Sequence, residues 1–162
     1  MLTNTLDRLQ RAPLAKAPAT RAARTAGAST PSDHAFVGLV TAFRRYGGLA
    51  RGDEIADRLL QLHGTNLSSL ARRIVARELI CFEWHGELWL PLLQFDWVDM
   101  SLQPAMKQVA AELAGVFDAW EVCCWLATPN SSLDDRTPLD VLENDPGAVL
   151  QAAREDRFVA RG

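Results

Sequence analysis

The sequence offers few side chains whose type and spacing would support catalysis. It contains neither a glycine-rich phosphate loop nor a Gly-x-Ser-x-Gly nucleophile motif. Cys81 and His85 lie close in sequence, but no second Cys/His pair lies near them, so a zinc site is not expected. The Asp134-Asp135 pair has the chemistry to contact a cation, although an acidic surface turn is the more common role for such a pair. We therefore predict a protein that is not an enzyme and that holds neither a metal nor a cofactor.

Arginine side chains are the second group that could form a functional site, because a guanidinium group binds the phosphates of nucleic acids well. Arg72, Arg73 and Arg77 share the polar face of a helix that apolar spacing predicts over residues 66–78. An arginine run on a helix is more often a solvated face than a binding site. DNA binding and a structural or dimerisation role for this part of the chain are therefore both open.

The elements around this helix favour a known arrangement. A first helix is predicted to begin near Asp33, and a period of two in the apolar residues predicts a β-hairpin over residues 79–95. Three short helices followed by a hairpin resemble a winged helix-turn-helix. In that arrangement, residues 66–78 form the recognition helix and residues 83–89 form the wing. The glutamates of this wing are poorly suited to phosphate contacts.

The hairpin has a predicted register. Phe82 pairs with Trp89 as an aromatic cross-strand contact when His85 and Gly86 form a two-residue turn. Pro91 lacks a backbone N–H group, so it must lie at an edge or end the pairing.

A third set of residues lies near the C-terminus and follows an ordered pattern. A Trp-Leu pair is followed by Pro-Asn, a Leu, a short polar turn, a Pro-Leu pair and a final Leu. The residues are Trp125, Leu126, Pro129, Asn130, Leu133, Thr137, Pro138, Leu139 and Leu142. Helical spacing predicts one long helix over residues 103–127, then two short helices that begin with Pro138 and Pro146. Taken alone, this spacing describes a closing helical bundle that needs no partner.

The same pattern resembles the toxin-binding domain of the Xre/MbcA/ParS antitoxin family. The resemblance implies a protein that binds and inhibits a RES-class toxin, an NAD-consuming enzyme similar to ADP-ribosyltransferases. It also implies that a mobile C-terminal tail, here residues 154–162, lies at the entrance of the toxin's active site, where arginine would suit an anion-binding cleft. The implied toxin-binding residues are Trp125, Pro129, Asn130, Arg154, Arg157, Phe158, Arg161 and Gly162.

The first half of the chain departs from this family. Its members usually carry an Xre-type helix-turn-helix before the toxin-binding domain, and residues 35–78 do not match that pattern. We predict an antitoxin-type binder of a RES-class toxin that also binds operator DNA and autoregulates its operon. The alternative is a winged-helix DNA-binding regulator whose C-terminal unit serves dimerisation or another protein partner.

Composition and charge fit an α+β fold that is mostly helical. The 162 residues are 48% apolar and 23% charged, and three cysteines cannot build a disulfide framework. With no apolar run long enough for a membrane span, we expect a cytoplasmic protein, and we predict a homo-oligomer. Seven arginines lie within residues 44–77, whereas residues 78–153 contain thirteen acids and two bases. The predicted parts are a disordered basic tail (1–34), a winged-helix-like unit (35–100) and a toxin-binding helical unit (101–162).

Overall fold

The computed structural model of the chain describes residues 31–64 and 67–162. Most of the predicted basic tail, residues 1–30, lies outside the described residues. Order begins at α1 (Asp33–Phe43), where the side chain of Ser32 accepts a hydrogen bond from the backbone N–H of Ala35. A serine in this position satisfies one of the free N–H groups of the first helical turn and so fixes the start of the helix.

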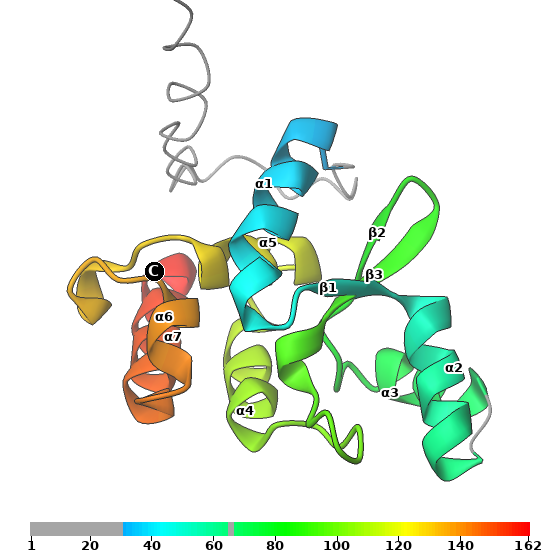
Figure 1. Cartoon of the computed structure of the whole chain (residues 1–162). Coiled ribbons are helices and arrows are strands. Elements are labelled where there is room, and N and C mark those ends of the chain that lie inside the picture. The colour runs from blue at the N-terminus through cyan, green and yellow to red at the C-terminus, as the bar shows by residue number, and fades with distance from the viewer. Residues whose placement is uncertain (1–30, 65–66) are drawn as a thin grey trace, which may run out of the picture.

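The fold is mostly helical, with one small antiparallel sheet (Figure 1). The first half consists of α1, the 3₁₀ turn η1 (Arg44–Tyr46), β1 (Leu49–Arg51), α2 (Gly52–His63), α3 (Leu67–Val75), β2 (Phe82–Trp84), β3 (Glu87–Pro91) and η2 (Leu92–Gln94). The second half consists of α4 (Pro104–Leu113), α5 (Ala119–Ala127), η3 (Ser131–Leu133), α6 (Pro138–Leu142) and α7 (Pro146–Arg161). In Figure 1, α6 and α7 lie at one end of the molecule, α2 and α3 lie at the other, and α1, α4 and α5 lie between them.

The β-hairpin is confirmed in the predicted register. Phe82 lies opposite Trp89, and both His85 and Gly86 have positive φ angles, of 52° and 75°. Two left-handed residues make the turn that matches the twist of paired strands. Pro91 is the last residue of β3 and ends the pairing. The sheet also contains a strand that periodicity did not predict, because β1 has only three residues, and it places β3 in the centre of the order β1-β3-β2.

The prediction of one long helix over residues 103–127 is wrong. The chain forms α4 and α5, separated by residues 114–118. Asp118 ends the break as an N-cap: its carboxylate accepts from the N–H of Glu121, and the Glu121 carboxylate accepts from the N–H of Asp118, both at 2.8 Å. This capping box starts a new helix. The sequence did not reveal the break, because apolar residues keep helical spacing through it. Two of them, Val116 and Phe117, are partly buried although they lie outside both helices.

The C-terminal helix is longer than predicted. The resemblance implied a mobile tail over residues 154–162, but α7 continues to Arg161. After Gly147 the helix contains neither glycine nor proline, and two of its arginines, Arg154 and Arg157, form ion pairs with Glu112 of α4. The segment predicted to be a tail is therefore the last part of a helix.

The hydrophobic core joins the two halves of the chain. Its larger cluster contains Phe36, Leu39 and Phe43 of α1 together with Phe82 of the hairpin and buried residues from α4 to α7. A second cluster lies between α2, α3 and β3. The helix α1 thus packs into the same core as the C-terminal helices. Within the described ranges, the structure contains no helix with the length and apolar character of a membrane span.

Candidate functional site

Two residues of the Trp-Leu/Pro-Asn pattern hold the end of α5 against α7. Trp125 Nε1 donates a hydrogen bond to Asp156 Oδ2 at 2.6 Å, and Asn130 Nδ2 donates to the same oxygen at 2.7 Å. The side-chain oxygen of Asn130 accepts from the N–H of Ser132 at 2.9 Å, which begins η3. Trp125 and Asn130 were predicted to contact a toxin, and in the structure they hold α7 in position. Pro129, which lies beside them, is exposed.

Asp156 was not identified from the sequence, because a single acid in a charged helix carries no signal of its partners. Replacement by alanine leaves both the Trp125 and Asn130 donors without this acceptor. We expect Asp156→Ala to lower the free energy of unfolding by about 1–3 kcal/mol, the usual cost of leaving partly buried donors unpaired. The measurement is urea denaturation followed by tryptophan fluorescence.

The neighbouring Glu155→Ala is the matched control for this variant. Glu155 accepts from Ser132 and Gln151, but all three side chains are exposed, so its loss should cost no more than about 0.5 kcal/mol. Equal effects of the two substitutions would show that Asp156 has no special role in holding the connection.

A second set of contacts fixes α6 beside the end of α1. Thr137 is the N-cap of α6: its hydroxyl accepts from the N–H of Asp140 at 3.1 Å and donates to Asp140 Oδ2 at 2.6 Å. The hydroxyl of Tyr46 donates to the other carboxylate oxygen of Asp140. These two hydroxyl groups, with Thr137 the stronger influence, lower the pKa of Asp140.

Three arginines predicted to bind the toxin face α4. Arg154 Nε lies 3.0 Å from Glu112 Oε1, and Arg157 forms an ion pair with Glu112 Oε2. Arg161 lies over the break after α4, since a Cβ atom built on Gly115 would be 2.8 Å from Arg161 Nη2. Arg154 and Arg157 therefore orient α7, and both form ion pairs with the single carboxylate of Glu112.

The ion pairs of Glu112 predict a pH dependence of stability. The hydrogen bond from Arg154 is the largest of the interactions that lower the pKa of Glu112 below its ordinary value of 4.5. A depressed folded-state pKa means that this stabilisation is present above pH 4.5 and is lost as the pH falls through the folded-state value. We therefore expect Glu112→Gln to be less stable than the unmodified chain at neutral pH, with the difference disappearing in acid.

The measurement is urea denaturation across that pH range, with Glu143→Gln as control. Glu143 is an exposed glutamate of the same half of the chain, and its replacement should leave the pH profile unchanged. A stability difference for Glu112→Gln that persists unchanged at the lowest pH would contradict the ion-pair interpretation.

The last turn of α7 exposes apolar side chains. Phe158 is 80% exposed and Val159 is 73% exposed, and Gly162 caps the turn through its N–H group. Aromatic side chains are enriched among the residues that contribute most to protein interfaces. The structure thus gathers Phe158, Arg161 and Gly162 at one end of the molecule.

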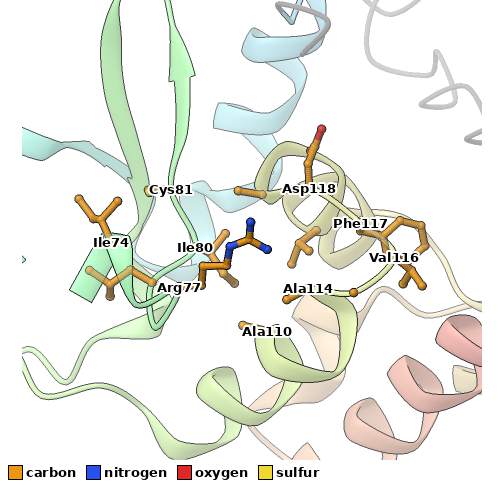
Figure 2. Close-up of a pocket in the computed structure, with 13 residues that line it drawn as sticks. Ile74, Arg77, Ile80, Cys81, Ala110, Ala114, Val116, Phe117 and Asp118 are labelled. Carbon is orange, nitrogen blue, oxygen red and sulfur yellow. The ribbon is translucent and has the colours of Figure 1, made fainter. Parts of the chain in front are cut away.

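The three arginines predicted to contact DNA do not lie on one helix. The predicted helix over residues 66–78 ends at Val75, so Arg77 lies outside it. Arg72 is exposed, whereas Arg73 is half-buried and its Nη1 atom lacks a hydrogen-bond partner within the described residues. Arg77 has a positive φ angle of 53°, and its guanidinium group points toward α4 and α5 (Figure 2).

The hairpin tip contacts α1. His85 Nε2 lies 2.8 Å from Asp33 Oδ1, and the Trp84 ring stacks on Phe36 with 3.8 Å between ring centroids. Cys81 is half-buried, and burial raises the pKa of its thiol. Across residues 31–64 and 67–162, no three His, Cys, Asp or Glu side chains are placed to hold a metal ion.

Comparison with known protein families identifies one match. The family model described as the antitoxin Xre/MbcA/ParS C-terminal toxin-binding domain matches residues 109–150. The matched segment begins in α4 and ends in α7, so it contains the pattern from Trp125 to Leu142 and ends before Arg154. No curated protein and no solved structure matches the chain.

Proposed function

We propose that this protein is an antitoxin that binds and inhibits a RES-class, NAD-consuming toxin through its C-terminal helices. The observation that carries the proposal is the match of residues 109–150 to a toxin-binding domain, directly before a helix end that exposes Phe158 and Val159. In this function the protein acts by binding and needs no catalytic group of its own.

The contacts around α7 explain how the chain would present this end to a toxin. Trp125 and Asn130 hold α7 from one side through Asp156, and Glu112 holds it from α4 through two arginines. Because the helix is fixed in this way, its last turn is preorganised and little conformational entropy is lost on binding. Phe158 is the natural anchor, since exposed aromatic residues contribute strongly to the centres of interfaces.

Arg161 is the residue best placed to contact an anion of the toxin's active site. It is exposed, and none of the described carboxylates forms an ion pair with it, in contrast to Arg154 and Arg157. A guanidinium group binds phosphate in a bidentate manner, so Arg161 would occupy the site of an NAD phosphate while Phe158 fills the apolar part of the entrance.

The test is to produce the chain together with a RES-class toxin and to measure NAD consumption by the purified toxin as the chain is added. We expect a stable complex and loss of NAD consumption at equimolar chain. A toxin that remains fully active and elutes separately from the chain would contradict the proposal.

We also propose that the first half of the chain binds operator DNA as a winged helix-turn-helix. The order α1-β1-α2-α3-β2-β3, with the sheet order β1-β3-β2, supports this proposal. In it, α3 would be the recognition helix, and its Arg72 is exposed. Binding of this kind would allow the protein to regulate its own operon.

Charge reversal of Arg72 tests the DNA contact. We expect Arg72→Glu to weaken binding to the operator by about tenfold and to reduce the slope of log affinity against log salt by about 1, because one phosphate contact is lost. Arg136→Glu, an equal change of charge in the C-terminal half, is the control and should leave binding unchanged. A mobility-shift titration at several salt concentrations measures the affinity and its salt dependence for both variants. If Arg72→Glu binds the operator as tightly as the unmodified chain does, this arginine is excluded from the interface.

A further inference from the structure

A pocket of about 510 Å³ lies between the two halves of the chain. One wall is the connection from α3 to β2, including Ile80 and Cys81, and the other is the break between α4 and α5, including Val116, Phe117 and Val122. Figure 2 shows these two walls facing each other across the pocket. The volume lies within the range of small-molecule sites, roughly 300–1,000 Å³.

An exposed cation, Arg77, is among the residues that line this pocket. The guanidinium group of Arg77 extends from the α3–β2 connection toward the α4–α5 wall (Figure 2). The backbone at this point is held by hydrogen bonds from the N–H of Arg77 to the carbonyl of Ile74 and from the N–H of Glu78 to the carbonyl of Arg73, each 3.0 Å long. The left-handed conformation of Arg77 is thereby fixed and directs its side chain into the pocket.

The charge of Arg77 has no partner in the pocket. None of the described carboxylates forms an ion pair with it, and Asp118, the carboxylate among the residues that line the pocket, points away from it in Figure 2. The Asp118 carboxylate instead accepts a hydrogen bond from the N–H of Glu121 at the start of α5. Cys81 is neutral at physiological pH because burial raises the pKa of its thiol. The remaining wall is largely apolar.

We propose that this pocket binds a small anionic ligand with an apolar body. The anionic group of the ligand pairs with the Arg77 guanidinium, and the apolar body lies against Ile80, Phe117 and Val122. A carboxylate, sulfonate or phosphate satisfies the first requirement. The inference is independent of toxin binding, because it uses none of the exposed residues at the end of α7.

The probe for the test is 8-anilinonaphthalene-1-sulfonate, which combines a sulfonate with two aromatic groups and fluoresces when it leaves water. We expect the folded full-length chain to bind one equivalent. Arg77→Gln should raise the Kd about tenfold, because a charge-assisted hydrogen bond is lost. Arg58→Gln, an exposed arginine of α2, is the matched control and should bind as the unmodified chain does. Absence of binding, or equal Kd values for Arg77→Gln and the unmodified chain, would overturn the proposal.

A second measurement locates the ligand without relying on a variant. N-ethylmaleimide labelling, followed by mass spectrometry, compares Cys81 in the pocket wall with Cys124, which does not line it. We expect the probe to slow the labelling of Cys81 and to leave the rate at Cys124 unchanged. Labelling of Cys81 at the same rate with and without the probe would show that the probe binds elsewhere and would overturn the assignment.

Discussion

Removal of residues 158–162 is expected to abolish the proposed inhibition of a RES-class toxin while leaving the fold of the chain intact. The deletion takes away Phe158, Val159 and Arg161, all exposed, and ends α7 at Arg157. The ion pairs of Glu112 and the hydrogen bonds to Asp156 remain, so the rest of α7 keeps its position. Loss of an aromatic anchor and a charged contact should raise the inhibition constant by about 100-fold or more.

The single substitution Phe158→Ala separates the aromatic contribution from that of Arg161. Its matched control is Val98→Ala, because Val98 is 84% exposed in the loop after η2, far along the chain from α7. NAD consumption by the toxin, titrated with each variant, provides the comparison, and circular dichroism checks the helical content. Full inhibition by the chain that ends at Arg157 would contradict the proposed role of the last turn.

Phe43→Ala is expected to give the largest loss of stability. Phe43 is fully buried at the end of α1 and belongs to the cluster that includes the C-terminal helices. Truncation of a buried phenylalanine leaves a cavity and costs about 3–5 kcal/mol. For a chain of this size, the corresponding fall in Tm is on the order of 10 °C. Val37→Ala on the exposed side of the same helix should change stability by no more than about 0.5 kcal/mol.

The same experiment tests whether α1 and the C-terminal helices share one core. Thermal unfolding of Phe43→Ala, followed by circular dichroism and by tryptophan fluorescence, should show one transition that shifts equally for both signals. Two separate transitions, or a shift in one signal without the other, would contradict a single shared core.

The hairpin could be predicted from sequence because its signals are local. Phe82 and Trp89 face each other across a two-residue turn with a glycine, and both the turn and the register follow from those residues alone. The break between α4 and α5 could not be predicted in the same way. Helical spacing of apolar residues crosses it, and the capping box of Asp118 outweighs that spacing locally.

At the candidate site, sequence resemblance identified Trp125 and Asn130 but not their shared acceptor, Asp156. Contacts between helices depend on how α5 and α7 pack, and the spacing of residues along the chain does not reveal that packing. For the same reason, the sequence did not reveal the role of Glu112. Its ion pairs with Arg154 and Arg157 show that these two arginines, which were predicted to bind a toxin, position α7. Phe158 and Arg161 are exposed, and their contact with a toxin, which the resemblance implied, stays a prediction.

The central claim is the proposal that the C-terminal helices bind and inhibit a toxin. Titration calorimetry of the full chain against a RES-class toxin tests this claim most directly. The account predicts a saturable complex whose stoichiometry coincides with the loss of NAD consumption. The absence of any binding heat at several temperatures, together with undiminished NAD consumption at saturating excess of the chain, would contradict it.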